Sequence, residues 1–430
     1  MKIVARILGL LAFWGGALTV LRPRTGWFSM LMWMPKLLAG ALAPFFVVIG
    51  SVAVLVSSWH RDWWGLLPGF LGMLTAGNYV RRVVAPHDGF ASAFGSDWES
   101  RISPELKPRL LAQRWTPFLC EKTAVSCQED IIYGYNAQSG TPLLADIWQP
   151  APEIAPTGLA VVYVHGGAWR YGTKNMRTAT FFKHLARQGH VVMDVAYTLA
   201  PLAAIPQMVV EIKCAISWLK MNTAVYGINP ERIVLMGGSA GGHLALLTAY
   251  SMGESCLQAP ATCGDSSVCA VVSFYGPPDF RALQDAVGRG YGRVAYSRLT
   301  KRLLHYFDSR FKVLSGIEVD TEIEDPLRLL ADVVGGLPAE VPEAYRLTSP
   351  ITYVGPHCPP TLLIQNTHDF SGMMPEVMGL AQALRVADVP VVYVELPNTE
   401  HAFDLVWPQI SPAAQSAFYD VDRFLALMVN

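Results

Sequence analysis

A single serine, Ser239, lies among four glycines in the stretch GGSAGG at residues 237–242. The apolar run RIVLM precedes this stretch, and the helix-like sequence AGGHLALLTAYS overlaps its end. G-x-S-x-G between a strand and a helix is the pattern of a nucleophile elbow, a sharp turn with no room for side chains two positions to either side of the serine. The stretch lacks the Lys-Ser/Thr pair of a phosphate-binding loop. It therefore predicts that Ser239 is a nucleophile at a helix N-terminus, where developing negative charge is stabilised.

A second glycine-containing loop, HGGAW at residues 165–169, follows the run VVYV. It matches the HGGG-type loop of an oxyanion hole, with Ala168 in the place of the third glycine. Glycine lets the backbone approach a substrate closely. We expect the N–H groups of Gly166, Gly167 and Ala240 to hold the oxyanion, and His165 to bond within its own loop.

A nucleophilic serine also needs a base and an acid that orients it, in the chain order serine, acid, histidine. Asp369 follows the apolar run TLLIQN, and His401 follows the next run, VVYVEL. Both residues would then lie at the sheet edge that carries Ser239, so they are the predicted acid and base. The alternatives are Glu400 or Asp404 as the acid, and His368 or His243 as the base.

Strand-like and helix-like segments alternate from residue 129 onward. Short apolar runs typical of strands buried on both faces occupy residues 158–165, 190–197, 232–237, 269–276, 361–366 and 391–396. Helical stretches separate most of them, at residues 176–188, 206–226, 240–252 and 375–388. The sequence NAQSGT at 136–141 predicts a hairpin between DIIYGY and PLLADIWQP. This order predicts an α/β fold, a mostly parallel sheet with helices on both faces.

The first 85 residues have a different composition. The whole chain of 430 residues is 52% apolar and only 16% charged, whereas soluble domains carry about 25% charged residues. Apolar segments at 3–21, 37–59 and 63–80 predict a transmembrane helical region of two or three spans over residues 1–85. A signal peptide is the alternative for the first segment, and buried soluble helices are the alternative for the other two. With three spans, the side of the catalytic domain would carry Arg22, Arg24, Lys36, Arg81 and Arg82, and the positive-inside rule then places this domain in the cytoplasm. A segment that lies flat in the interface would reverse this orientation.

The remaining boundaries follow from these two regions. Residues 86–128 are predicted to form a polar connector with a short amphipathic helix at 103–115, and residues 129–430 the catalytic domain. The segment 278–348 is predicted to be a lid-like insertion between two core strands. The net charge of −1 gives no indication of a nucleic-acid partner, and no metal-ligand spacing occurs. The seven cysteines favour free thiols, since a loop disulfide would require an oxidising compartment.

Over roughly residues 130–430 the chain resembles α/β-hydrolases of the hormone-sensitive-lipase-like carboxylesterase group. The resemblance rests on HGGAW, MGGSAGG, THDF and EHAF, and on AYTLAP at 196–201, where Thr198 replaces the arginine of a Y-R-L-A-P segment. The HGGA form also resembles prenylcysteine methylesterase-like and kynurenine formamidase-like members. The resemblance implies attack of the serine on an ester carbonyl and hydrolysis of an acyl-enzyme, without metal or diffusible cofactor.

Taken together, these features predict a membrane-anchored serine hydrolase that cleaves carboxylic esters, either small-molecule or lipid-derived, in contact with membrane lipid. An acyltransferase or amidase would use the same three residues and is the first alternative. A catalytically silent membrane interaction protein is the alternative from another class of function.

Overall fold

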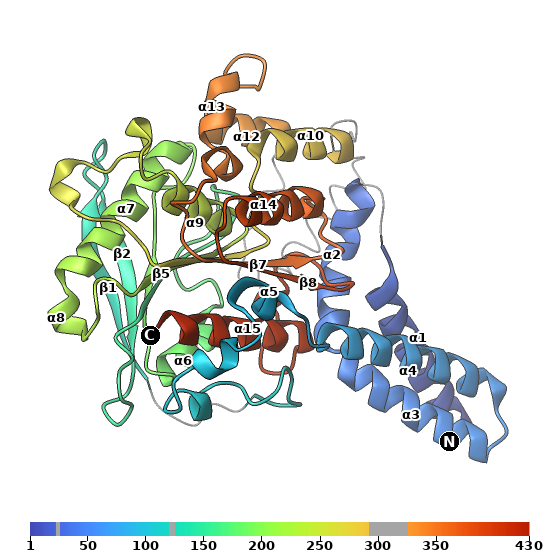
Figure 1. Ribbon diagram of the computed structural model, residues 1–430. Coiled ribbons are helices and arrows are strands. Elements are labelled where there is room, and N and C mark those ends of the chain that lie inside the picture. The colour runs from blue at the N-terminus through green and yellow to red at the C-terminus, as the bar shows by residue number, and fades with distance from the viewer. Residues whose placement is uncertain (23–25, 120–124, 292–325, 430) are drawn as a thin grey trace.

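A twisted sheet of eight strands forms the centre of the computed structural model, which describes residues 1–22, 26–119, 125–291 and 326–429 (Figure 1). The strand order is β1-β2-β4-β3-β5-β6-β7-β8 within these residues. The strands are β1 (Ser126–Tyr135), β2 (Pro142–Gln149), β3 (Ala160–Val164), β4 (Val191–Val195), β5 (Ile233–Gly238), β6 (Ala270–Phe274), β7 (Thr361–Asn366) and β8 (Val391–Leu396). The pairs from β4 to β8 are parallel, and β1 and β2 form the predicted antiparallel hairpin. The predicted fold class is confirmed.

Helices cover both faces of the sheet, as expected for strands that are apolar throughout. Helices α7 (Ile205–Met221), α9 (Ala240–Tyr250) and α14 (Met374–Val386) lie on one face, and α6 (Ala179–Arg187) and α15 (Pro412–Met428) lie on the other (Figure 1). Two separate apolar cores result, because successive side chains of a strand point to opposite faces: Val162 belongs to one core and Val161 to the other. The predicted helix at 206–226 breaks at Asn222, where α7 ends and the short α8 (Thr223–Tyr226) begins.

The described part of the chain before the connector forms the helices α1 (Lys2–Val20), α2 (Gly26–Ala41), α3 (Ala43–Trp59) and α4 (Trp63–Val83). Helices α1, α3 and α4 pack against one another in a bundle that projects from the domain, whereas α2 runs back along the domain (Figure 1). The prediction of one continuous helix over 37–59 is wrong, since the chain bends by 71° between α2 and α3. Pro44 explains the break, because its ring and missing N–H cannot continue the helix of α2.

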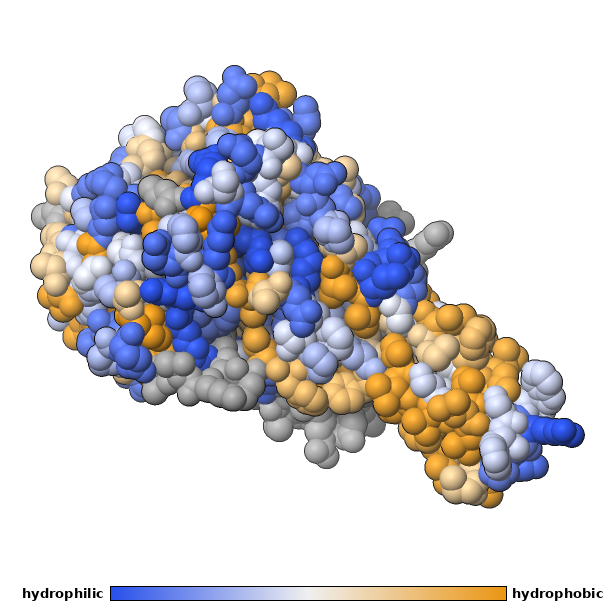
Figure 2. All heavy atoms as spheres, turned by 60° about the horizontal axis from the view of Figure 1, so that its bottom comes forward, coloured by the Kyte–Doolittle hydropathy of each residue, from blue (hydrophilic) through white to orange (hydrophobic). Residues whose placement is uncertain are grey.

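The interior of the bundle is built from very small residues. A Cβ atom added to Gly72 of α4 would lie 2.2 Å from the carbonyl carbon of Ala12 in α1, and one added to Gly50 of α3 would lie 2.7 Å from the carbonyl oxygen of Gly69 in α4. The outer surface carries large apolar side chains instead, which form the hydrophobic projection in Figure 2. Small residues between helices and large apolar residues outside are typical of helix packing in lipid.

One helix in the described residues, α1, is long and apolar enough to cross a membrane. Residues 31–41 and 43–59 meet the same criterion only as a bent pair, and α4 does not meet it. The structure thus supports one candidate span near the N-terminus and does not support the multi-pass arrangement of two or three spans predicted above.

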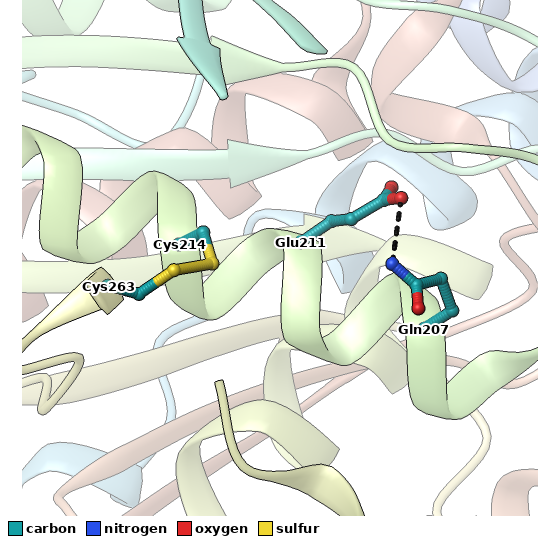
Figure 3. Close-up of a disulfide and its surroundings, with 4 residues drawn as sticks. All are labelled: Gln207, Glu211, Cys214 and Cys263. Carbon is teal, nitrogen blue, oxygen red and sulfur yellow. Dashed lines mark hydrogen bonds between the residues drawn. A yellow bond between two sulfur atoms is a disulfide. The ribbon is translucent and has the colours of Figure 1, made fainter. Parts of the chain in front are cut away.

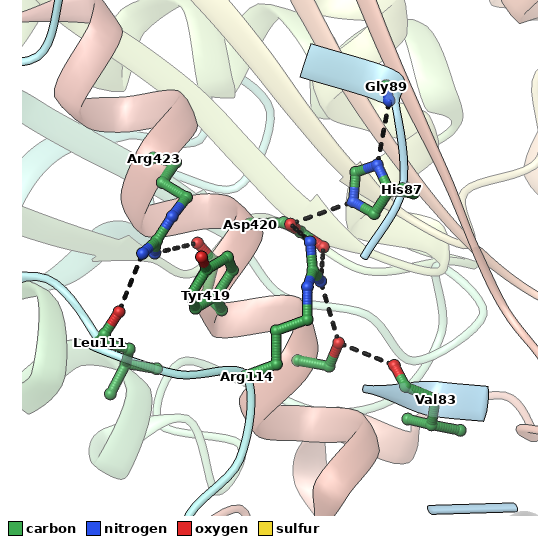
Figure 4. Close-up of polar contacts among 9 residues, drawn as sticks. Val83, His87, Gly89, Leu111, Arg114, Tyr419, Asp420 and Arg423 are labelled. Carbon is green, nitrogen blue, oxygen red and sulfur yellow. Dashed lines mark hydrogen bonds and ion pairs between the residues drawn. The ribbon is translucent and has the colours of Figure 1, made fainter. Parts of the chain in front are cut away.

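The connector at 86–128 lies along α15. Up to residue 119 it contains α5 (Gly89–Phe94) and single turns of 3₁₀ helix at Trp98–Arg101 and Lys107–Arg109, and β1 begins at Ser126, before the predicted end of the connector. The predicted helix at 103–115 is therefore wrong, because Pro108 cannot donate a helical hydrogen bond. Arg114 makes two hydrogen bonds of 2.7 and 2.9 Å to the buried Asp420 carboxylate, which His87 also contacts at 3.1 Å (Figure 4). These contacts hold the connector on the catalytic domain.

A disulfide joins Cys214 of α7 to Cys263, which ends the 3₁₀ turn Ala261–Cys263 (Figure 3). The prediction that the cysteines are free thiols is wrong for this pair. It failed because Cys214, inside the helical stretch 206–226, is 49 residues from its partner in the sequence. The other cysteines that the structure describes are free: Cys127, Cys256, Cys269 and Cys358.

Candidate active site

Ser239 lies between the last residue of β5 and the first residue of α9, with backbone angles of φ 57° and ψ −121°. A non-glycine residue adopts such angles only where its surroundings force it to. A Cβ atom added to Gly241 would lie 2.0 Å from the carbonyl oxygen of Val164, and one added to Gly237 would lie 2.4 Å from Gly241. The glycines thus let the turn pack against β3, and the turn directs the Ser239 hydroxyl away from the sheet.

The structure brings the three predicted residues together. His401, in the loop after β8, places its Nε2 2.8 Å from Oγ of Ser239. Its Nδ1 lies 2.8 Å from Oδ2 of Asp369, which follows β7. One imidazole therefore connects the hydroxyl to the carboxylate, with each heavy-atom distance in the range of a good hydrogen bond.

Asp369 is held as a carboxylate although it is buried. Burial by itself would raise the pKa of this carboxyl group, but the charge and hydrogen bond of His401 lower it, and so do the donors of Ser371. The net effect is a pKa below the usual value. The N–H of Ser371 donates to Oδ1 at 2.8 Å and fixes the carboxylate plane. Asp369 can thus stabilise positive charge on His401.

The loop at 165–169 approaches the elbow from the end of β3. A Cβ atom added to Gly166 would lie 2.8 Å from the carbonyl oxygen of Gly238 and 3.3 Å from Cβ of Ser239. Gly167 has a φ of +113°, a conformation that glycine adopts at little cost. Within the described part of the chain, no protein group accepts a hydrogen bond from the N–H groups of Gly166, Gly167 or Ala240. These three donors beside Ser239 therefore remain available to a ligand oxygen.

Comparisons with known proteins show what this chain is similar to. The family profile described as BD-FAE matches residues 145–305. The chain is 31% identical over 300 residues to the "Probable carboxylic ester hydrolase LipM" of Mycobacterium tuberculosis, and 29% identical over 279 residues to its "Esterase LipQ". These alignments cover 69% and 64% of this chain, but the chain spans only 60% and 57% of the relatives' own lengths.

Among solved structures, a thermophilic esterase of Thermogutta terrifontis superposes with a TM-score of 0.51 at 21% sequence identity. The match covers 69% of this chain and 91% of that one. The chain has an α/β-hydrolase fold. In an α/β-hydrolase, groups at the carboxyl ends of the parallel strands meet at one sheet edge. The ends of β3, β5, β7 and β8 carry the predicted residues here.

The alternative residues all have other partners in this structure. Nδ1 of His243 accepts a hydrogen bond from the Trp169 indole at 3.1 Å, and its Nε2 lies 2.7 Å from the carbonyl oxygen of Thr348. Burial lowers the pKa of His243 to about 4, so this ring is neutral. Asp404 accepts a hydrogen bond from the hydroxyl of Tyr275. Neither residue takes part in the connection from Ser239 to Asp369.

His368 and Glu400 contact the ammonium group of Lys36 on α2, a contact that our sequence analysis missed. The indole N–H of Trp33, also on α2, donates to the carbonyl oxygen of His401 at 2.8 Å. Lys36 is the only charged residue between Arg24 and Arg61. A lone charge within a long apolar stretch is a signal of function, and it could have identified Lys36 from the sequence.

Proposed function

We propose that this protein is a membrane-associated serine hydrolase that cleaves carboxylic esters. The proposal rests on the connection of Ser239 through His401 to Asp369. This connection lies at the elbow, beside three free backbone N–H groups. The names of the relatives, a probable carboxylic ester hydrolase and an esterase, support it.

In the first half of the reaction, Nε2 of His401 takes the proton of Ser239 as Oγ attacks the ester carbonyl. The N–H groups of Gly166, Gly167 and Ala240 stabilise the oxyanion of the tetrahedral intermediate. One such donor contributes about 3 kcal/mol to the stability of the transition state. Asp369 stabilises the imidazolium ion that forms, and His401 then gives its proton to the leaving alcohol.

In the second half, water takes the place of the alcohol. His401 removes a proton from this water, the hydroxide attacks the acyl-enzyme on Ser239, and the same oxyanion donors are used again. The collapse of this intermediate releases the acid and returns the proton to Ser239. An alcohol or amine in the place of water would make the reaction an acyl transfer, whereas an amidase would release an amine in place of the alcohol in the first half. Product analysis with added alcohol or amine, and assays on amide substrates, distinguish these alternatives.

We also propose that the insertion at 278–348 shapes the substrate pocket. Its described parts are α10 (Phe280–Tyr291), α12 (Pro326–Val334) and α13 (Pro342–Leu347), and residues 292–325 lie outside the described part of the chain. The ring of Phe280 packs 4.9 Å from that of Trp169, the residue that ends the loop of Gly166 and Gly167. The insertion is thereby linked to the oxyanion donors.

The bundle of α1, α3 and α4 supports an apolar or lipid-derived substrate. Its outer face exposes large apolar residues: Ile3, Ile7, Leu10, Trp14, Val48, Leu55, Trp63, Trp64, Leu67 and Phe70. A contiguous apolar surface of this kind indicates contact with lipid or with a partner. A hydrolase held at a bilayer has direct access to esters dissolved in it.

A fluorophosphonate probe and p-nitrophenyl esters of increasing acyl length test the proposal on the full chain. We expect the probe to label the native protein, and labelling and ester hydrolysis to be lost in Ser239→Ala. Ser100→Ala, which changes an exposed serine of the connector, is the matched control and should keep both. An unlabelled native protein would instead support the silent interaction protein.

A further inference from the structure

The two loops that carry the proposed acid and base are contacted by helices from the N-terminal region. Besides its hydrogen bond to His401, Trp33 packs its ring edge-on against Phe370, with 5.3 Å between ring centroids. Phe370 follows Asp369 in the chain, and its ring lies 5.1 Å from that of His401. On α4, the hydroxyl of Tyr79 lies 3.4 Å from Oγ1 of Thr399. The N-terminal region therefore contacts both loops close to the reacting groups.

Lys36 makes the most direct of these connections. Its side chain is buried, with 3% of the residue exposed, and its ammonium group donates to Nδ1 of His368 at 3.2 Å and pairs with the carboxylate of Glu400. His368 immediately precedes Asp369, and Glu400 immediately precedes His401. A single cation on α2 thus joins the residues next to two members of the Ser-His-Asp arrangement.

The charges in this contact are complementary. Burial, followed by the charge of Lys36, lowers the pKa of His368 to about 4, so its ring is neutral and Nδ1 can accept a hydrogen bond. The carboxylate of Glu400 has little exposure, and within the described residues its Oε2 has no hydrogen-bond partner. Burial raises the pKa of Glu400 to about 7, and the charge and hydrogen bond of Lys36 oppose this rise. The ammonium group therefore supplies the main compensation for the carboxylate form of Glu400 next to His401.

A buried ion pair is weak evidence of stability, because apolar residues of similar size often stabilise a protein as well or better. What an ion pair with additional hydrogen bonds provides is a defined geometry. That requirement is strict at this site, since a displacement of about 1 Å can cost roughly 100-fold in rate. The geometry here joins two loops that must hold Asp369 and His401 in line with Ser239.

We propose that Lys36 is a positioning residue, and that α2 is part of the catalytic assembly as well as a link to the bundle. Its ammonium group holds the loops at 367–371 and 398–402 in the register that aligns His401 with Ser239. This inference rests on the proposed hydrolase function. It adds that the N-terminal region acts on turnover and not only on location.

Lys36→Met in the full chain tests the proposal, because methionine keeps most of the length of the side chain and removes the cation. We expect kcat to fall about 10- to 100-fold, with KM for a short-chain p-nitrophenyl ester nearly unchanged. Labelling of Ser239 by the fluorophosphonate probe should slow in parallel, since it needs the same base. The double variant Lys36→Met with Glu400→Gln should have a kcat no lower than that of Lys36→Met, because it leaves no unpaired carboxylate.

Arg6→Met is the matched control, since it also removes the cation of an ion pair with a carboxylate of low exposure, Asp62, but within the bundle. It should keep the native kcat. If Lys36→Met does not fold in a thermal unfolding assay, Trp33→Phe replaces it. That change removes the N–H donor to His401 and keeps an aromatic ring, and we expect a smaller fall in kcat.

A native kcat and labelling rate in folded Lys36→Met, or a change confined to KM, would overturn the positioning role. If the proposed function is wrong, the result is different: the native protein does not react with the probe, and ester hydrolysis does not depend on Ser239. The two failures are therefore distinguishable in one set of assays.

Discussion

The catalytic domain and the N-terminal bundle bury opposite kinds of residue. The domain encloses valine, leucine, isoleucine and aromatic side chains on both faces of its sheet. The bundle encloses glycine and alanine, including Gly9, Ala12 and Gly72, and exposes leucine and tryptophan. Burial of large apolar groups drives folding in water, whereas close backbone contact drives helix association in lipid. The proposed association of the bundle with a membrane would account for this contrast.

Helix α2 belongs to neither pattern completely. It lies between the bundle and the domain, and its Leu37 and Ala41 are part of the apolar core that also contains α15 residues such as Phe418. Its polar contacts, through Trp33 and Lys36, are with the loops of the candidate site. The candidate active site therefore lies beside the boundary between the bundle and the catalytic domain. The predictions below test residues on both sides of that boundary.

The largest effect is expected from the buried acid of the catalytic domain. Asp369→Asn should lower kcat by about 10⁴-fold, because the amide no longer stabilises the imidazolium form of His401. Asp404→Asn, which removes the carboxylate bonded to Tyr275, should cause a much smaller loss. Steady-state hydrolysis of a soluble ester measures both. If the two losses were reversed, Asp404 would be the acid.

The disulfide should give the next largest effect, on stability. Closing a loop with a sequence separation of 49 residues stabilises the folded state by about 4 kcal/mol in the chain-entropy model. We expect the double variant Cys214→Ala with Cys263→Ala to lose about this much free energy of unfolding in urea titrations. Native protein treated with dithiothreitol should behave in the same way.

The same bond tests the side of the membrane on which the domain lies. Disulfides persist in oxidising compartments, so their formation in cells would place the domain outside the cytoplasm, against the positive-inside expectation. That expectation counted Lys36 as a charge flanking the membrane, but this residue is buried against the catalytic loops. Blocking free thiols in intact cells, followed by reduction and labelling with a maleimide polymer, detects the bond. The double cysteine variant should show no shift that depends on reduction.

Much of the fold could be predicted because the pattern that indicates each strand or helix lies within a short stretch of the sequence. Runs such as TLLIQN and RIVLM are buried strands, and the chain order of strands and helices determined a parallel sheet. The errors have specific causes. Pro44 and Pro108 interrupt two predicted helices. A proline ends or bends a helix but leaves the apolar or amphipathic pattern of the sequence unchanged, so the pattern alone does not reveal the break.

The residues of the candidate site also fall into two groups, those that the sequence predicts and those that it does not. Ser239, Asp369 and His401 each follow a strand, so the topology brings them to one edge, and their positions could be inferred. The contacts of Trp33 and Lys36 with loops more than 330 residues away could not be inferred. They depend on how α2 packs on the domain, and no local pattern encodes that packing. Only the isolation of Lys36 among apolar residues indicated a special role.

The apolar exterior of the bundle can be tested with a pair of similar substitutions. Leu10 lies at the middle of α1 and is 48% exposed, while Met378 on α14 of the catalytic domain is 46% exposed. Leu10→Asp should weaken membrane association by about 3 kcal/mol if α1 lies in lipid. Met378→Asp should have no effect, because this face contacts water. The fraction that stays with membranes after carbonate washing measures the difference, and an equal retention of both variants would show that the two exteriors contact the same solvent.

The smallest expected effect is on the pH dependence of stability in the catalytic domain. Burial lowers the pKa of His190 to about 4, whereas an unfolded histidine has a pKa of about 6.5. Between these values the folded state binds fewer protons than the unfolded state, so stability decreases as the pH falls. For His190 the loss is about 2 kcal/mol at pH 5 relative to pH 8. His190→Gln should therefore lose less stability than the native chain over this range. Denaturant titrations at the two pH values measure the difference. If both proteins had the same pH dependence of stability, His190 would become protonated without opening the core between β3, α6 and α15.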